Sequence, residues 1–391
     1  MAIATNDAVI VASGRTAMGR SKNGQFRYVR AEDMSAALVD GLFAKHADLD
    51  PTAVDELIWG CANQTGEQGA NLARQVTIVS RLPNSVPAHT VNRLCGSSMT
   101  ALHTATHAIM AGVGDMYVVG GVEHIGHVPM MKGMDLDPRI SQHAARASMN
   151  MGLTAEICAR KRNIGREQQD EFGVRSHQRA SAATESGDFD SEIIAIDAHD
   201  ADGRLIRASR DEPIRPETDI EGLSALKPVF DPVNGTITAG TSSQFSDGAS
   251  AMIIMSAERA KADGIEPLAR IAATGVAGME PSMMGFGPVP SSAKALDRAR
   301  LTIQDIGAVE INEAFAAQSL ACLVDMELAD VMDEKVNLYG GAIALGHPFG
   351  CSGTRITATL LNVMRNKGEQ FGLATMCVGM GQGTATVLEA I

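Results

Sequence analysis

Apolar runs typical of buried strands alternate with runs that have helical spacing, and this alternation limits the possible folds more than any other feature of the sequence. Met34, Leu38 and Leu42 lie four apart, on one face of a predicted helix. The alternation predicts an α/β fold. In order, the runs are strand-like 8–12, helix-like 34–43, strand-like 56–61, helix-like 72–79, strand-like 88–92, helix-like 97–110 and strand-like 116–120.

The last third of the chain repeats this plan. A strand-like run at 309–312 opens a predicted helix over 313–328. The stretch 336–341 shares its valine, asparagine and final glycine with 91–96, which is weak evidence alone. Because strand, glycine turn, helix and strand follow in the same order in both places, we predict an internal duplication.

Between about 121 and 245 the alternation breaks down, which predicts a large insertion. This segment contains a polar helix at 166–185 and an arginine-bearing stretch at 204–215. Insertions at the edge of an α/β core commonly form a wall of the binding site. The predicted division is an N-terminal half at 1–120 and 246–265, an inserted loop domain at 121–245, and a C-terminal half at 266–391.

Composition excludes several classes of protein. The chain has 391 residues, 45% of them hydrophobic, which is enough for a large core in two or three domains. A net charge of -13 without a lysine and arginine stripe disfavours nucleic-acid binding. The first apolar run is too short for a signal peptide or a membrane span, so we expect a cytoplasmic protein.

The cysteine and histidine spacings give no sign of a disulfide framework or a metal centre. Six scattered cysteines form no Cys-x-x-Cys pair, and we expect reduced thiols. The pairs His103 with His107 and His124 with His127 lack the glutamate of a His-Glu-x-x-His zinc site. No metal is predicted.

Cys95 is the candidate nucleophile. It precedes Gly96-Ser97-Ser98 at a predicted turn from a strand into a helix. The dipole and the free N–H groups of that helix N-terminus would favour a thiolate and could bind an oxyanion. The alternative is a buried core cysteine, which is the commoner role of this residue type.

His347 and Cys377 lie in two further glycine-rich settings. His347 precedes a proline and follows a stretch with three glycines, which would let its side chain reach a cleft and act as a base near neutral pH. Cys377 ends an apolar strand before Gly379, Gly381 and Gly383. A structural histidine and a simple tight turn are the alternatives. The glycine spacing is not that of a dinucleotide fingerprint.

The segments 92–98, 312–315, 340–355 and 377–385 resemble the four active-site motifs of the thiolases, in order and spacing, and the resemblance covers essentially the whole chain. The stretch 19–33 is most similar to the bacterial 3-ketoacyl-CoA thiolases that form the β subunit of the fatty acid oxidation complex. The resemblance implies a duplicated five-layered αβαβα core with an inserted loop domain. It also implies an acyltransferase that cleaves 3-ketoacyl-CoA with coenzyme A, the last step of β-oxidation.

The resemblance also implies roles for five residues. Cys95 attacks the 3-keto carbon after His347 takes its proton, and an acyl-enzyme thioester forms. Cys377 protonates the departing enolate of acetyl-CoA and then deprotonates incoming coenzyme A. Asn312 would hold a water beside His347 as one oxyanion hole, and the N–H groups of Cys95 and Gly379 would form the second.

Further residues match the family's contacts to coenzyme A and the acyl chain. Arg215 and Ser243 fall where the coenzyme contacts lie, although a solvated arginine and a turn serine are the alternatives. Met151 matches the lining of the acyl pocket, and we place Phe315 of the second motif in the same binding group. Coenzyme A is a substrate, and no permanently bound cofactor is implied.

Two departures from the short-chain pattern bear on specificity. Asn150 stands where short-chain biosynthetic members usually have histidine, and Ser98-Met99-Thr100 replaces the commoner glycine-containing continuation of the nucleophile motif. We therefore expect activity on acyl groups longer than four carbons. The physiological direction stays open.

The family further implies a homodimer, with 64–75 as a candidate contact, and an α subunit that carries enoyl-CoA hydratase and 3-hydroxyacyl-CoA dehydrogenase. A biosynthetic acetoacetyl-CoA thiolase or another condensing enzyme of the same fold is the alternative function. Ketoacyl synthases use one cysteine with histidines, so Cys377 argues against them. A catalytically dead scaffold would be expected to lack Cys95, His347, Asn312 or Cys377.

Overall fold

Ten strands form one mixed sheet in a computed structural model that describes residues 4–130 and 132–391. The strand order is β10-β11-β12-β9-β1-β8-β5-β3-β4, and β2 pairs with β8 beside this path. A separate hairpin joins β6 and β7. The strands are β1 Ala8–Arg15, β2 Gly19–Arg20, β3 Glu56–Gly60, β4 Ala88–Val91, β5 Met116–His124, β6 Ile196–His199, β7 Leu205–Ala208, β8 Ser246–Ser256, β9 Ala269–Gly278, β10 Ala308–Ile311, β11 Phe371–Val378 and β12 Gln382–Ala390.

The two halves of the sheet repeat one topology. In the first half β3 runs parallel to β5, β5 antiparallel to β8, and β8 antiparallel to β1. In the second half β10, β11, β12 and β9 repeat this order and these directions. The short pairing of β1 with β9, at Val9 and Ile10, joins the halves. This repetition confirms the predicted duplication.

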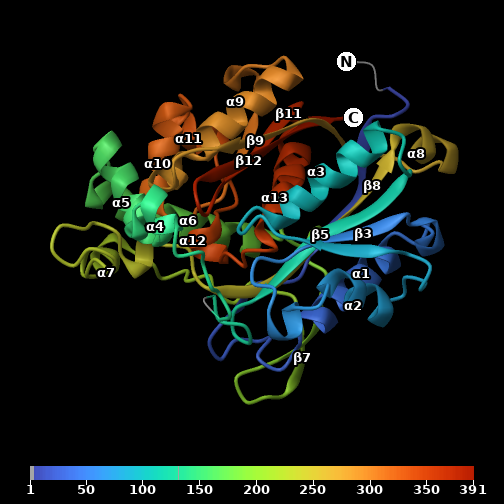
Figure 1. Cartoon of the computed structure of the whole chain (residues 1–391), viewed down its shortest axis with the longest axis horizontal. Coiled ribbons are helices and arrows are strands. Elements are labelled where there is room, and N and C mark those ends of the chain that lie inside the picture. Colours follow the sequence, from blue (N-terminus) through green and yellow to red (C-terminus); the bar gives the residue numbers. More distant parts are fainter. Residues whose placement is uncertain (1–3, 131) are drawn as a thin grey trace.

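Helices cover both outer faces of the sheet and also fill the space between its halves (Figure 1). The helices α1 and α2 pack on the first half, α9 packs on the second, and α3 and α13 lie between the halves. The helix α10 shares a core cluster with β10, β11 and β12 of the second half. This is the predicted five-layered arrangement. The helices are α1 Ala31–Lys45, α2 Leu72–Val79, α3 Ser97–Met110, α4 Ile140–His143, α5 Met151–Arg162, α6 Arg166–Ser186, α7 Ile220–Ser224, α8 Ala257–Asp263, α9 Pro288–Ala299, α10 Ala316–Asp325, α11 Met332–Lys335, α12 Ala342–Leu345 and α13 Ser352–Lys367.

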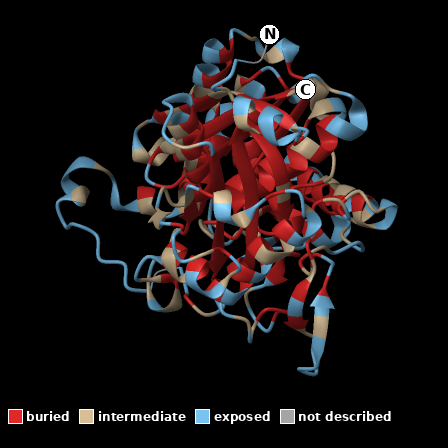
Figure 2. Ribbon diagram, turned by 90° about the vertical axis from the view of Figure 1, so that its right-hand side faces the viewer, coloured by how far each residue is buried: buried red, intermediate tan, exposed pale blue. Residues whose placement is uncertain are grey.

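The core follows these layers, and the buried residues concentrate on the sheet and the two central helices (Figure 2). The middle layer packs Met99 and Leu102 of α3 against Ile356 and Leu360 of α13. A β-carbon at Gly353 would lie 2.4 Å from the Met99 nitrogen, so the glycine lets α13 approach the backbone of α3. Close approach of these helices brings their N-termini together at the centre of the molecule.

One predicted helix begins later than the sequence indicated. The expected helix over 313–328 is α10, which starts only at Ala316. Before it, the Asn312 N–H donates to the Thr375 carbonyl at 3.0 Å, and Phe315 is extended and pairs with Ser242. The chain therefore stays extended past β10 because neighbouring backbone segments take up its hydrogen bonds.

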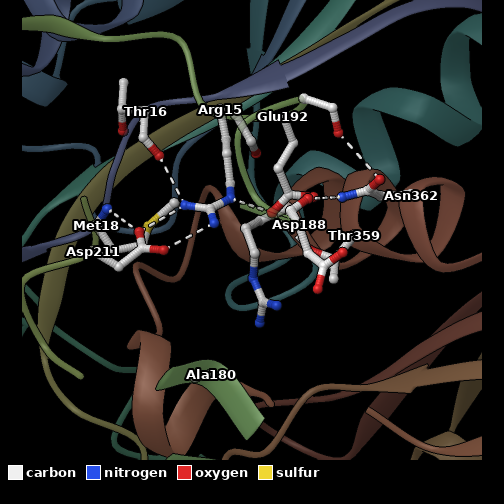
Figure 3. Close-up of polar contacts among 12 residues, drawn as sticks. Arg15, Thr16, Met18, Ala180, Asp188, Glu192, Asp211, Thr359 and Asn362 are labelled. Carbon is white, nitrogen blue, oxygen red and sulfur yellow. Dashed lines mark hydrogen bonds and ion pairs between the residues drawn. The ribbon is translucent and has the colours of Figure 1, made fainter. Parts of the chain in front are cut away.

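A buried ion-pair group anchors the inserted segment to the core (Figure 3). Arg15 of β1 is fully buried and donates to both oxygens of Asp211, at 2.7 and 2.9 Å. Its Nε donates to Glu192 at 2.7 Å. Because an unpaired charge at this depth would be costly, the three residues depend on one another and fix the path of the insertion.

Among the residues that the structure describes, no helix combines the length and the apolar character needed to cross a bilayer.

Candidate active site

Cys95 lies on a tight turn between β4 and α3, as predicted. The Asn92 Oδ1 accepts the Leu94 N–H at 2.8 Å, and the Ser97 hydroxyl donates to the Leu94 carbonyl at 2.6 Å. The same hydroxyl accepts the Arg93 N–H at 2.9 Å. Together these bonds hold Leu94 in the left-handed region, at a φ of 46°. A non-glycine residue in that region is strained, and such strain commonly marks a positioned functional side chain.

The Cys95 sulfur is a thiol at rest. Two backbone N–H groups, those of Gly379 and of Cys95 itself, favour the charged form of the sulfur and so lower its pKa. Burial outweighs them and raises the Cys95 pKa to about 11. The expected preference for a thiolate at the helix N-terminus is therefore not enough alone, and the thiol needs a base. Part of the Cys95 surface stays accessible, as a nucleophile requires.

His347 is buried, and each of its ring nitrogens has a polar neighbour. Its Nδ1 lies 2.6 Å from the Ser352 hydroxyl, which donates its single proton to the Pro348 carbonyl at 3.0 Å. With the Ser352 proton on the Pro348 carbonyl, the hydroxyl oxygen accepts from Nδ1–H, and this tautomer leaves the Nε2 lone pair facing the Asn312 amide. Burial, followed by the charge of Arg355, lowers the His347 pKa to about 3, so the expectation that this group titrates near neutral pH is wrong for the free site.

Asn312 lies beside the basic nitrogen of His347. Its Nδ2 is 3.4 Å from His347 Nε2, and the residue is fully buried at the end of β10. The Asn312 Oδ1 has no protein partner among the described residues. The side-chain amide of Asn312 therefore provides polar atoms next to His347 Nε2, where they could help to stabilise a developing oxyanion.

Cys377 and Gly379 complete the group from the end of β11. Cys377 is buried, and burial, followed by the proximity of Cys95, raises its pKa well above the usual value. The two thiols therefore lie within electrostatic reach of each other. A β-carbon at Gly379 would lie 2.9 Å from the Leu94 side chain, which explains why a glycine brings its N–H to Cys95.

Glu313 holds the loop that leads to His347, a role that the sequence analysis did not assign. Its buried carboxylate accepts bonds from Ser176 Oγ at 2.6 Å, Asn337 Nδ2 at 2.8 Å and the Ile343 N–H at 3.1 Å. The Ile343 N–H belongs to the first turn of α12, where a carboxylate is favourable. Two sequence features could have indicated this role. Glu313 stands beside Asn312 in the second motif, and the glycine pair at 340–341 leaves room for its side chain.

Gln244 was also missed, and it connects His347 with one of the residues proposed for coenzyme binding. The His347 N–H donates to the Gln244 carbonyl at 3.0 Å. The Gln244 side chain accepts a bond from Arg215 at 3.2 Å, and Arg215 is exposed. Ser243 donates its N–H to the Ala314 carbonyl at 3.0 Å, which places it against the second motif.

Two of the residues predicted to bind the substrates, Met151 and Phe315, share an apolar cluster with Cys377. Met151 and Phe315 both pack in this cluster, and the Phe315 ring meets Phe230 edge to face at 5.7 Å. The Met151 sulfur lies 3.7 Å from the β-carbon position of Gly379. The cluster therefore gives Cys377 an apolar wall.

The chain belongs to the thiolase family. Two family models match it, the thiolase N-terminal domain over residues 8–258 and the thiolase C-terminal domain over residues 265–390.

Curated relatives and solved structures of this family match the chain over its length. A 3-ketoacyl-CoA thiolase of Chromohalobacter salexigens is 58% identical over 391 residues, and one of Marinobacter nauticus is 57% identical, each covering 100% of both chains. Human mitochondrial 3-ketoacyl-CoA thiolase has a TM-score of 0.90 at 35% identity and covers 99% of this chain and 100% of its own. An acetyl-CoA acetyltransferase of Bacillus anthracis has the same TM-score and identity and covers 100% of both chains.

Proposed function

We propose that this chain is a 3-ketoacyl-CoA thiolase that uses coenzyme A to cleave 3-ketoacyl-CoA into acetyl-CoA and a shortened acyl-CoA. The observation that carries the proposal is a pair of thiols, the partly accessible Cys95 and the buried Cys377, within electrostatic reach of each other. One thiol can bind carbon while the other transfers protons. The full-length identity to relatives named 3-ketoacyl-CoA thiolase supports the substrate class.

In the first half of the reaction, His347 Nε2 takes the Cys95 proton as the sulfur attacks the 3-keto carbon. Because burial keeps both groups neutral at rest, proton transfer and attack occur together. The bond between C2 and C3 then breaks, which leaves an acyl-Cys95 thioester and the enolate of acetyl-CoA. Cys377 gives its proton to C2. Asn312, beside His347 Nε2, is the candidate for stabilising one oxyanion.

In the second half, the Cys377 thiolate takes the proton of incoming coenzyme A. The new thiolate attacks the acyl-Cys95 carbonyl, and the acyl chain leaves as acyl-CoA. The protonated His347 then returns its proton to Cys95, which restores the starting state. The N–H groups of Cys95 and Gly379 favour negative charge at the sulfur, which supports their assignment to the oxyanion that forms on the adjacent carbonyl.

The inserted segment 121–245 is the proposed wall for coenzyme A and the acyl chain. Arg215 and Ser243 are assigned to the coenzyme, and Met151 and Phe315 to the acyl chain. The exposed guanidinium of Arg215 suits a phosphate, and the apolar cluster beside Cys377 suits a hydrocarbon. No resident cofactor is needed. The proposed location is the cytoplasm.

A homodimer through the edge strand is the proposed assembly. The strand β4 ends the sheet, and such an edge offers free N–H and carbonyl groups to a second chain. The candidate contact segment 64–75 lies against it, because Asn71 Nδ2 donates to the Ala88 carbonyl at 3.0 Å. The neighbouring Ile78 and Val79 are 58% and 54% exposed. A native mass measurement that gives a monomer at micromolar concentration would contradict this assembly.

The catalytic assignment is tested with Cys95→Ala and Cys377→Ala. We expect Cys95→Ala to form no acyl-enzyme and to lose thiolysis, because no other sulfur replaces the nucleophile. Cys377→Ala should still become acylated but turn over slowly, because the proton carrier is missing. Mass spectrometry of the intact protein after mixing with substrate distinguishes the two. Wild-type turnover in Cys95→Ala would overturn the proposal.

Chain length and partnership need separate tests. A series of 3-ketoacyl-CoA substrates should give the highest kcat/KM above four carbons, and a maximum at acetoacetyl-CoA would favour the biosynthetic alternative. Coexpression with a subunit that carries hydratase and dehydrogenase activities should yield a stable complex. Separate elution of the two chains would refute the partnership.

A further inference from the structure

Ser98 is a buried polar residue at the start of α3 with no assigned role. It lies three residues after Cys95 and is fully buried. The sequence analysis noted Ser98-Met99-Thr100 as a departure from the commoner glycine-containing motif. A buried hydroxyl costs free energy unless its donor and acceptor are both used, so its partners indicate what it does.

Both partners of Ser98 belong to the start of another helix, α13. The Ser98 hydroxyl donates to the Cys351 carbonyl at 2.9 Å and accepts the Thr354 N–H at 3.1 Å. Thr354 is the third residue of α13, so its N–H has no carbonyl partner within the helix. The N-cap residue Cys351 makes no side-chain capping bond. Ser98 therefore caps α13 from a neighbouring helix.

The start of α13 is also the part of the helix that orients the base. Its first residue, Ser352, holds His347 Nδ1 at 2.6 Å. From the opposite side, Ser250 of β8 donates to the Cys351 carbonyl at 2.7 Å. The first turn of α13 is therefore fixed by hydroxyl groups from two other elements, and only Ser98 belongs to the element that follows the nucleophile.

Glycines bring the backbones close enough for this link. A β-carbon at Gly60 would lie 2.4 Å from the Ser98 nitrogen, and one at Gly353 would lie 2.4 Å from the Met99 nitrogen. The start of α3 is thus enclosed by β3 and by α13. A small residue is required there, and serine adds the polar bridge that glycine could not supply.

We propose that Ser98 is a positioning residue that fixes the His347 base relative to the Cys95 nucleophile by capping α13 from α3. The inference rests on the proposed roles of Cys95 and His347. Without the hydroxyl, the Thr354 N–H and the Cys351 carbonyl lose one common partner, and the first turn of α13 can shift together with Ser352 and His347. The reaction would then lose alignment, while substrate binding would change little.

The chain offers a matched control in Ser35. This residue of α1 is fully buried, donates to the Ala31 carbonyl at 2.7 Å and accepts the Trp59 Nε1–H at 3.2 Å. It belongs to the outer helical layer. Ser35→Ala and Ser98→Ala therefore remove the same kind of hydroxyl, at the outer layer and at the site respectively.

The experiment measures the melting temperature, steady-state thiolysis and alkylation of Cys95 by iodoacetamide in Ser98→Ala, Ser98→Thr and Ser35→Ala. Cys95 is the one partly accessible cysteine among the described residues, and Cys95→Ala identifies its share of the alkylation. We expect both alanine variants to melt a few degrees lower. Only Ser98→Ala should lose about tenfold in kcat and in the Cys95 alkylation rate, with KM nearly unchanged.

Rescue decides between alignment and general destabilisation. Ser98→Thr keeps the hydroxyl and should regain most of the kcat. If Ser98→Thr does not fold, the comparison of Ser98→Ala with Ser35→Ala distinguishes misalignment of the site from general destabilisation. Equal kcat and alkylation rates in Ser98→Ala, Ser35→Ala and the parent would overturn the inference. Full activity in Cys95→Ala would instead refute the proposed function, which is a separate outcome.

Discussion

The proposed base His347 contacts a neutral hydroxyl, that of Ser352, whereas histidine bases in Ser-His-Asp sites are oriented by a carboxylate. The Ser352 hydroxyl favours the Nδ1–H tautomer when its own proton is donated to the Pro348 carbonyl. A neutral partner adds no charge that would favour imidazolium. Burial therefore dominates and lowers the His347 pKa to about 3. The resting imidazole is therefore neutral, and burial makes it a weaker proton acceptor than an exposed histidine.

Ser352→Ala should reduce kcat because His347 can then adopt either tautomer and rotate. The substitution removes one hydrogen bond between neutral groups. We therefore expect kcat to decrease about tenfold, while KM changes by less than about twofold. Ser352→Thr keeps the hydroxyl and serves as the control. Steady-state kinetics of the three proteins provide the measurement. A Ser352→Ala enzyme as fast as the parent would mean that other contacts orient the ring.

At the residue scale, the sequence predicted the candidate reactive groups better than the groups that support them. Cys95, His347 and Cys377 each stand in a glycine-rich setting that can be recognised in one dimension. Ser352 is a serine at the start of a helix. Its role depends on two hydrogen bonds, one with the Pro348 carbonyl and one with the imidazole ring of His347. Its role could therefore be assigned only from the three-dimensional contacts.

Among the elements, the short helix α12 depends on a carboxylate from a distant part of the sequence. Glu313 accepts the Ile343 N–H at 3.1 Å and packs against Gly341, which precedes the helix. A β-carbon at Gly341 would lie 2.2 Å from the Glu313 carboxyl carbon. The φ of Gly341 is -143°, a value that any residue can adopt, so the need for glycine here is steric.

Gly341→Ala should displace Glu313 and loosen the segment that leads to His347. Overpacking of this kind costs about 1–3 kcal/mol of stability, and we expect kcat to fall as well. Gly278→Ala is the matched control, because a β-carbon there meets nothing within 4 Å. Urea denaturation and steady-state kinetics test both variants. Unchanged stability in Gly341→Ala would show that Glu313 can move without cost.

The secondary structure shows the same division between local and distant causes. The predicted helices at 72–79 and 97–110 have the bounds of α2 and α3, because their hydrophobic spacing and flanking turns are local signals. The helix predicted from residue 313 begins three residues later, at Ala316, because β11 and the segment around Ser242 pair with the preceding backbone. Pairing partners that are distant in the sequence cannot be read from local periodicity.

Across the whole molecule, burial of neutral histidines makes stability depend on pH in the acidic range. Burial is the largest cause that lowers the pKa of His103 and His347 to about 3 and that of His177 to about 4. Each pKa is below the unfolded value of about 6.5, so the unfolded chain binds more protons as the pH falls. Asp247 has the opposite effect, because burial raises its pKa to about 7.

His103 allows this linkage to be measured apart from catalysis. Its Nε2 meets Thr386 Oγ1 at 2.9 Å on the sheet, and it takes no part in the proposed reaction. The stability that comes from the neutral, buried His103 is fully present above a pH of about 6.5 and is lost as the pH falls toward 3. Between pH 7 and pH 5 the free energy of unfolding of the parent should therefore fall by about 2 kcal/mol more than that of His103→Gln. The effects of Asp247 and the other histidines on the pH dependence cancel in this comparison, because both proteins contain them.

Urea denaturation at the two pH values measures the difference in the free energy of unfolding. A substitution of the exposed His143, His143→Gln, is the control and should show the same pH dependence as the parent. If His103→Gln lost as much stability as the parent, His103 would have to be protonated in the folded protein.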